Sequence, residues 1–201
     1  MSKRVTELPE PAADSGVSLE QAMQRRRSVR EYGPEPVSVQ HLGQLLWAAQ
    51  GVTDSAGRRT APSAGALGPM EVYVVTADGI AGYRPEGHRL ERVATGDRRR
   101  ALAAAAADQT QVAAAPVVMV ITGVLARTAW KYGGDRGWRY LNLEAGHVAQ
   151  NVLLQATALG LCGVPVGAFD DNAVMDVLGL PADHRPLYLL PIGHPAPSGV
   201  N

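Results

Sequence analysis

The sequence predicts a single α+β domain, and three observations point to it. Residues 116–122 form a continuous apolar run rich in β-branched side chains, which is typical of a strand buried on both faces. Residues 136–160 carry apolar side chains at helical spacing, which predicts a long amphipathic helix. Strands and helices do not alternate cleanly, as they would in a parallel βαβ fold. The 201 residues suit one large domain, and no linker or internal repeat divides them.

In the first half of the chain we expect an arm, two helices, a loop and a strand. Ser18 followed by Gln21 forms a capping box, which begins the first helix. Ser38 begins the second helix, and Gly51 ends it. The expected elements are a flexible N-terminal arm at 1–16, helices at 18–26 and 38–51, a loop at 52–68 and a strand at 70–76. The single domain then covers residues 17–201.

In the second half we expect three helices and three strands. Gly160 ends the long helix, and Asp170 or Asp171 caps a short helix. The expected elements are helices at 97–107, 136–160 and 170–178, strands at 116–122, 164–169 and 186–192, and an irregular segment at 123–136 that is broken at Gly133-Gly134.

The charge balance excludes two classes of partner. The chain has 19 Lys and Arg against 19 Asp and Glu, so its formal net charge is zero. A neutral chain has no overall field to attract nucleic acid or a membrane surface. Cys162 is the one cysteine, which excludes an intrachain disulfide and a zinc-thiolate cluster. With no signal peptide or membrane span in the sequence, we expect a cytoplasmic protein.

A dense group of arginines follows the first helix. Arg25, Arg26, Arg27 and Arg30 place four guanidinium groups within six residues, and Ser28 adds a hydroxyl. Guanidinium groups match phosphate oxygens in pairs, so this segment is a candidate phosphate site. A solvated basic face is the alternative. No GxxxxGK[ST] motif occurs, so side chains rather than a glycine loop would hold the phosphate.

Two glycine-rich segments are candidates for contact with a flat ligand. Residues 61–69 and 160–167 combine small side chains with backbone freedom, so their amides can approach a ligand closely. The alternatives are a plain surface loop for the first segment and a tight helix-to-strand turn for the second. Neither segment decides between these interpretations alone.

A polar stripe lies on the long helix beside its apolar face. Tyr140, Glu144, His147 and Asn151 are spaced four, three and four residues apart. Glu144 and His147 match the ExxH spacing of di-iron proteins, but that site needs a second ExxH, which the chain lacks. We therefore expect no metal site and interpret the stripe as a satisfied hydrogen-bond network.

Lys131 and Tyr132 are the candidate proton-transfer residues. Lys3 and Lys131 are the two lysines of the chain, and both Lys131 and Tyr132 can act as general acid or base when burial tunes their pKa. A lysine of a solvated loop is the alternative. No GxSxG motif occurs, and Cys162 has no His or Asn pattern around it, so we interpret it as a small buried apolar residue.

Taken together, these segments resemble the flavin-dependent nitroreductase superfamily, and within it the SagB-type dehydrogenases, also called thiazole/oxazole-forming oxidases. The likeness runs from about Ser18 to Pro195. The segments that carry it are RRSVR at 26–30, LLWAAQG at 45–51, RTAPSAGAL at 59–67, KYG at 131–133, RGWRY at 136–140, EAGHVAQN at 144–151 and residues 160–169. Their order and spacing together are more specific than any one of them.

The resemblance implies an FMN enzyme with a mixed sheet flanked by helices, built as an intertwined homodimer with flavin at the interface. Arg26, Arg27, Ser28 and Arg30 would bind the phosphate and ribityl chain. The residues implied beside the flavin ring, some of them from the partner subunit, are Pro62, Ser63, Ala64, Gly65, Leu67, Gly163, Val164 and Gly167. Lys131 and Tyr132 match the pair that abstracts a proton in azoline-oxidising members.

The sequence also departs from the family pattern. Many members end in a Lys or Arg that closes on the FMN phosphate, whereas His194 is the one basic residue of this tail. The leading hypothesis is an FMN oxidoreductase that reduces a nitro, quinone or similar acceptor with NAD(P)H, or that oxidises a small amine or azoline. The alternatives are a flavin-storage protein without turnover and a structural dimer. No Rossmann GxGxxG motif occurs, so a nicotinamide would bind over the flavin.

Overall fold

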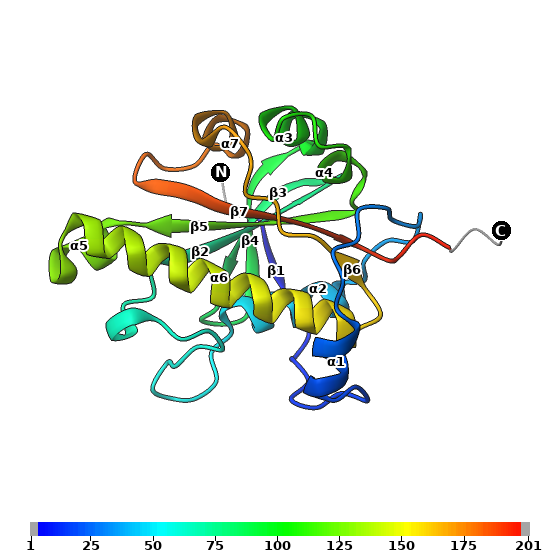
Figure 1. The fold of residues 1–201 in the computed structure, drawn as a ribbon, viewed down its shortest axis with the longest axis horizontal. Coiled ribbons are helices and arrows are strands. Elements are labelled where there is room, and N and C mark those ends of the chain that lie inside the picture. Colours follow the sequence, from blue (N-terminus) through cyan, green and yellow to red (C-terminus); the bar gives the residue numbers. More distant parts are fainter. Residues whose placement is uncertain (1–3, 198–201) are drawn as a thin grey trace.

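A seven-stranded sheet crosses the molecule, and helices cover both of its faces (Figure 1). The computed structural model describes residues 4–197. The strands follow the order β1-β4-β3-β2-β5-β7-β6, and every ladder between them is antiparallel. Ser28 adds a single parallel bridge to Gly163. The predicted α+β fold with a mixed sheet is therefore confirmed.

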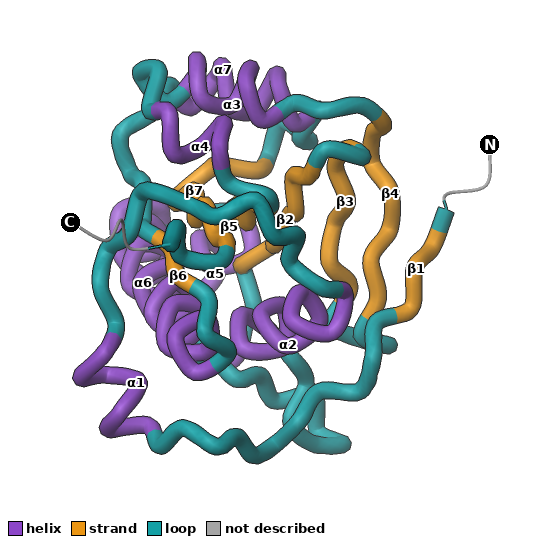
Figure 2. The backbone as a smooth tube through the Cα atoms, turned by 90° about the vertical axis from the view of Figure 1, so that its right-hand side faces the viewer, coloured by secondary structure: helices purple, strands orange, loops and turns teal. Residues whose placement is uncertain are grey.

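The strands are β1 (Val5–Glu7), β2 (Met70–Thr76), β3 (Gly79–Arg84), β4 (Arg89–Thr95), β5 (Val117–Val124), β6 (Cys162–Gly163) and β7 (His184–Gly193). The helices are α1 (Leu19–Arg25), α2 (Val39–Gln50), α3 (Arg99–Ala105), α4 (Thr110–Ala114), α5 (Ala126–Tyr132), α6 (Gly134–Ala158) and α7 (Asp171–Leu178), with a 3₁₀ turn η1 (Ala64–Ala66). Figure 2 shows α3, α4 and α7 over one face of the sheet and α2 and α6 over the other.

Strand β5 connects the two hydrophobic cores of the molecule. Val117, Met119 and Ile121 pack in the core shared with α2 and α6. Val118 and Val120 pack in the core shared with α3, α4 and α7. Since successive side chains of a strand point to opposite faces, an unbroken apolar run is what a sheet covered on both sides requires. The prediction of a buried strand at 116–122 is confirmed.

The polar caps place the helix starts where the sequence predicted them. Ser18 accepts a hydrogen bond from the Gln21 N–H at 3.2 Å, and Ser38 accepts one from the His41 N–H at 3.1 Å. Asp170 caps α7 by accepting from the Ala173 N–H at 2.8 Å. Each cap satisfies an N–H that has no partner inside its helix.

Two predicted segments differ in the structure. Residues 123–136, expected to be irregular, contain α5 and the start of α6, separated at Gly133 (φ +79°). Neither helix has a side-chain cap, so the usual N-terminal signal is missing from the sequence. The strand expected at 164–169 does not form: within these residues there is only an isolated bridge between Val166 and Leu189, and the short strand β6 precedes them. Pro165 interrupts this ladder because it has no N–H to donate.

The hairpin formed by β3 and β4 was not predicted. Its sequence is rich in Gly, Arg and Glu, which gives a weak strand pattern. Hydrogen bonds between β3 and β2 stabilise the hairpin, and the local sequence does not indicate this pairing. A β-bulge between Ile80 and Ala81 shifts the register of the β3–β4 pair.

The segment expected to be an N-terminal arm is held at two points. Residues of β1 pair with β4 at the edge of the sheet. Further along, Ala12 exchanges two hydrogen bonds with the Gln44 side chain, at 2.8 and 3.0 Å. The flexibility of the arm in solution stays a prediction, and residues 1–3 and 198–201 lie outside the described part of the chain.

Within residues 4–197, no helix combines the length and the apolar composition that a membrane span requires.

Candidate active site

The arginine segment lies beside the strand that follows α6. The Val29 N–H donates to the Gly163 C=O at 3.1 Å, and Ser28 and Gly163 form the parallel bridge. Arg25, Arg27 and Arg30 are exposed, and Arg26 is half-buried. The structure thus joins two segments that lie more than 130 residues apart in the sequence.

These arginines have no acidic partner among residues 4–197. None of Arg25, Arg26 or Arg30 forms an ion pair there, and Arg27 donates only to the backbone carbonyls of Gln24 and Arg26. Four positive groups without counter-charges create a locally positive surface on a neutral chain. Such a surface favours a ligand with two negative charges, such as a phosphate monoester.

The segment after α6 contains both buried and exposed glycines. Gly163 is buried, and a Cβ there would lie 2.7 Å from the Pro191 carbonyl oxygen, so a side chain cannot fit. Val164 is also buried, whereas Gly167 is exposed. Pro165 and Ala168 are also exposed, although neither is among the individual residues that the resemblance implies beside the flavin ring. The accessible residues of this segment are Pro165, Gly167 and Ala168, whereas Gly163 and Val164 are bonded to β7.

The second glycine-rich segment folds into a compact loop against α6, which we call the 60–68 loop (Thr60–Gly68). The Asn151 amide donates to the Thr60 carbonyl at 3.2 Å. The Ser63 hydroxyl accepts from the Gly68 N–H at 3.0 Å, which closes the loop around η1. Gly65 has a φ of +63°, the left-handed region that glycine adopts most readily. Pro62 and Gly65 are exposed, and Ser63, Ala64 and Leu67 are half-buried.

Lys131 and Tyr132 lie against this loop. A Cβ built on Gly65 would be 2.6 Å from the Tyr132 Oη and 2.9 Å from the Lys131 Nζ. The Tyr132 ring also packs edge-on against Tyr140 of α6, with 4.7 Å between ring centroids. Two polar groups able to transfer protons are therefore gathered at the tip of the loop, Lys131 exposed and Tyr132 half-buried.

The candidate residues form two groups: Lys131 and Tyr132 of one group lie before the start of α6, and Gly163 of the other lies after its end. The first set, which we call the phosphate-site residues, consists of Arg26, Arg27, Ser28, Arg30, Gly163, Val164 and Gly167. The loop group consists of Pro62, Ser63, Ala64, Gly65, Leu67, Lys131 and Tyr132. Helix α6 has 25 residues and is about 37 Å long. Figure 1 shows α5 at one end of α6 and β6 at the other. Lys131 and Gly163 of one chain therefore lie too far apart to contact the same flavin.

The polar stripe on α6 corrects one interpretation. Glu144 is only 2% exposed, and neither of its carboxyl oxygens has a hydrogen-bond partner within the described part of the chain. The predicted satisfied network is therefore wrong at this position. Burial raises the pKa of Glu144 to about 7. His147 is exposed, and residues 4–197 hold no group of three potential metal ligands.

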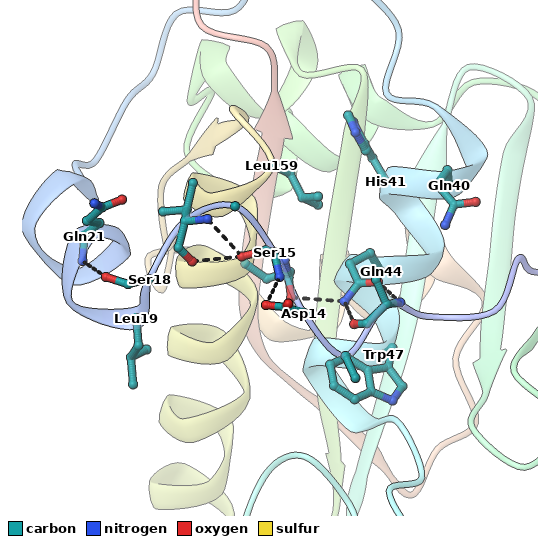
Figure 3. Close-up of a pocket in the computed structure, with 15 residues that line it drawn as sticks. Asp14, Ser15, Ser18, Leu19, Gln21, Gln40, His41, Gln44, Trp47 and Leu159 are labelled. Atoms are coloured by element: carbon teal, nitrogen blue, oxygen red, sulfur yellow. Dashed lines mark hydrogen bonds between the residues drawn. The ribbon is translucent and has the colours of Figure 1, made fainter.

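Two cavities lie beside these groups rather than within them. One, of about 750 Å³, lies between residues 12–19, α2 and the end of α6 (Figure 3). Gln44 bonds there to Ala12 and to Gln155, so its amide is already satisfied. The other, of about 360 Å³, extends along α2 and α6 as far as Thr60. None of the residues predicted to carry the chemistry lines either cavity.

A model of the nitroreductase family matches residues 23–194, most of the described chain. The chain belongs to the nitroreductase family. A protein named as a nitroreductase from Methanocaldococcus jannaschii is 45% identical over 183 residues, which cover 88% of this chain and 91% of that protein. A solved structure named as a nitroreductase from Ralstonia eutropha is 31% identical, has a TM-score of 0.89 and covers 98% of this chain and 91% of that one.

The chain is less similar to a SagB-type relative than to these two nitroreductases. The trifolitoxin-processing protein of Rhizobium leguminosarum is 28% identical over 165 residues, which cover 73% of this chain and 44% of that protein. The two nitroreductases match at higher identity and over more of their own lengths. Family membership is thus shown at the level of nitroreductase-family oxidoreductases, and the SagB-type subgroup stays a proposal.

Proposed function

We propose that the chain is an FMN-dependent oxidoreductase that carries out two-electron hydride transfer with a small substrate. Members of its family typically bind FMN. The observation that carries the proposal is the arginine segment, which has no acidic partner among residues 4–197 and is bonded to Gly163. A phosphate monoester fits this donor set, and the exposed Pro165, Gly167 and Ala168 are the proposed neighbours of the flavin ring.

The proposed phosphate site uses Arg26, Arg27, Ser28 and Arg30. Their guanidinium and hydroxyl groups supply charge-assisted hydrogen bonds, which are stronger than neutral ones. The tail offers little further help, because His194 lies near Glu35, with 3.6 Å between Nδ1 and the carboxylate. Phosphate affinity in this chain would therefore rest on the arginine segment.

We also propose that the working enzyme is a homodimer. Within one chain, the length of α6 separates the phosphate-site residues from Lys131 and Tyr132 of the loop group. In a two-fold dimer, the loop group of the partner subunit can lie beside the arginines of this chain. The outer side of α6 is suited to such a contact, because Leu143 is 52% exposed and Gly146 has open space where a side chain would be. Trp130 of α5, 73% exposed, adds apolar surface beside the loop group.

When bound, FMN supplies the hydride chemistry, and the protein supplies placement and proton transfer. Lys131 and Tyr132 are the proposed proton-transfer pair, held at the loop tip by contact with Gly65. With an amine or azoline substrate, the pair takes a proton from carbon or nitrogen. With a nitro or quinone acceptor, the pair supplies one, and NAD(P)H is the proposed electron donor. Both roles require a substrate atom within hydrogen-bond reach of Nζ or Oη.

An FMN titration tests the binding part of this proposal. Wild-type protein should take up FMN and show the flavin absorption bands. Arg26→Ala and Arg30→Ala should each weaken affinity by about 10- to 100-fold, since a hydrogen bond to a charged group contributes about 1.5–3 kcal/mol. Arg98→Ala is the matched control, because Arg98 is exposed beside α3 on the other face of the sheet. Colourless wild-type protein that takes up no FMN would overturn the proposal.

A further inference from the structure

A groove of about 450 Å³ lies between the start of α2 and the strands β2, β3 and β4, and none of the candidate site residues lines it. Figure 2 shows that β4 and β1 lie beyond the end of α2. Most of the lining is apolar, including Val39 at the start of α2, which is 52% exposed. Pockets for small molecules have volumes of about 300–1,000 Å³ and largely apolar walls, so this groove is suited to a ligand of that size.

Three arginines line the same groove, and two of them lack a counter-charge. Arg99 is paired with Asp97 at 2.6 Å and donates to the Ala115 carbonyl at 3.0 Å, so its charge is balanced. Within residues 4–197, neither Arg4 nor Arg92 forms an ion pair. The groove therefore combines an apolar lining with two guanidinium groups that have no acidic partner in the described chain.

The pairing of β1 with β4 places these two arginines beside each other. The Arg92 N–H donates to the Arg4 carbonyl at 3.0 Å, and the next residue, Val5, pairs with Glu91. Like charges that neighbour each other across a sheet repel and destabilise it. The fold itself gains nothing from two adjacent cations, whereas an anion bound to both would remove the repulsion and accept charge-assisted hydrogen bonds.

The one acidic residue among those that line the groove is Asp78, in the turn between β2 and β3. It forms no ion pair with either arginine. Ala81, the β3 partner of Arg92, lies three residues further along the chain, which is about 10 Å in a strand. The positive end of the α2 dipole also lies at the groove, through Val39. The charge of the groove near Arg92 is therefore positive.

We propose that this groove binds a small organic carboxylate with an apolar body. Arg4 and Arg92 hold the carboxylate, since a guanidinium group matches its two oxygens. The apolar body lies against Val39, Leu42 and the neighbouring strands, where its burial adds affinity in proportion to the area removed from water. The site is separate from the residues proposed to bind FMN, so it does not rest on the proposed function.

An NMR titration of the full chain with decanoate, below the concentration at which it forms micelles, tests where the ligand binds. The amide signals of Val39, Ala77 and Arg92 should shift along one saturable curve, whereas that of Trp47, which lines the other two cavities, should not. Decanol lacks the charge and acetate lacks the apolar body. Each should bind at least about tenfold more weakly than decanoate.

Calorimetry with decanoate tests the role of the two arginines. Arg92→Gln removes the charge but keeps the backbone bond to Arg4, and it should weaken binding by about tenfold. Arg4→Gln should cause a similar loss. Arg100→Gln is the matched control, because Arg100 is exposed on α3 and does not line the groove. Since Arg4 and Arg92 repel each other, neither variant should lower the Tm, which separates a loss of binding from a loss of fold.

The same titration on FMN-saturated protein separates this groove from the proposed flavin site. Decanoate should bind with equal affinity with and without FMN, and also if the wild type takes up no FMN. Equal affinity for decanol and decanoate, or unchanged affinity in both Arg4→Gln and Arg92→Gln, would overturn the proposal. Shifts at Trp47 in place of Arg92, or loss of decanoate binding in the presence of FMN, would overturn it as well.

Discussion

Gly65 and Tyr132 lie in direct contact, although 66 residues separate them in the sequence. A Cβ on Gly65 would be 2.6 Å from the Tyr132 Oη, closer than non-bonded atoms approach. The loop that the family resemblance places at the flavin and the pair that it places at the substrate are thus one packed unit. Any side chain at position 65 must displace the proposed proton-transfer residues.

Gly65→Ala should therefore reduce turnover without unfolding the protein. The substitution costs about 1 kcal/mol or more because of the positive φ, and it also moves Tyr132 and Lys131 away from the loop. Turnover of any accepted substrate should fall at least about tenfold. Steady-state kinetics and urea unfolding measure the two effects.

Gly68→Ala is the matched control for that variant. Gly68 also has a positive φ, +54°, but nothing lies within 4 Å of a Cβ at that position. It should lose similar stability and keep turnover. Equal kinetic defects in the two variants would show that backbone strain, not contact with Tyr132, causes the loss.

Glu144 should make the protein less stable as the pH rises. Its pKa in the folded protein is about 7, above the ordinary value of 4.5, so the native state binds more protons than the unfolded state between these values. Stability from this group is full below about pH 4.5 and is lost as the pH rises through 7. The total change is on the order of 3 kcal/mol.

Urea unfolding of the wild type and Glu144→Gln at pH 5 and pH 8 measures this effect. The glutamine variant cannot ionise, so the difference in unfolding free energy between the two proteins should shift with pH in favour of the variant. Comparison of the two proteins cancels other titrations, such as that of His88, whose pKa burial lowers. A difference that stays constant across this range would contradict the assigned ionisation.

Lys131→Ala should lower kcat by about 10²- to 10⁴-fold, the usual contribution of a general acid or base. FMN affinity should change little, because Lys131 is not part of the arginine segment. Tyr132→Phe should give a comparable loss. Arg136→Ala is a control for a nearby exposed charge on α6. Unchanged kcat in Lys131→Ala on every accepted substrate would remove its role in proton transfer.

Leu143→Glu should disrupt the proposed homodimer. Leu143 is on the outer side of α6, and a charge there would have to be buried at the interface. Light scattering after gel filtration should show a dimer for the wild type and a monomer for the variant, with weaker FMN binding in the monomer. Val93→Glu, an exposed change on β4, should stay dimeric. A dimer of Leu143→Glu with full FMN affinity would place the interface elsewhere.

Local sequence patterns were sufficient for the elements that carry their own signals. The continuous apolar run of β5 is typical of a strand buried on both faces, and the helical spacing of apolar residues in α6 is typical of a helix buried on one face. These two patterns differ in period, so each element could be predicted from the sequence. The Ser and Asp caps of α1, α2 and α7 predict where those helices begin. Helix α5 and the β3–β4 hairpin have no such signal, and contacts with distant segments stabilise them.

The candidate site shows the same limit. Residue type and order suggested the arginines, the 60–68 loop and the Lys131–Tyr132 pair. Nothing local showed that Gly65 would lie against that pair, or that α6 would separate it from Gly163. The spacing of Glu144 in the polar stripe predicted that its carboxyl group would be hydrogen-bonded. Only the packing around Glu144 shows that its oxygens lack partners within the described chain.

The most direct test of the central claim is an anaerobic absorbance measurement on FMN-loaded protein mixed with NADH or NADPH. If the chain is an FMN oxidoreductase, one equivalent of the donor should reduce the flavin, so that its absorption bands disappear. The bands should return when an acceptor is added. A protein that holds FMN but bleaches with neither nicotinamide nor any amine or azoline donor would contradict the claim and identify the chain as a flavin-binding protein without turnover.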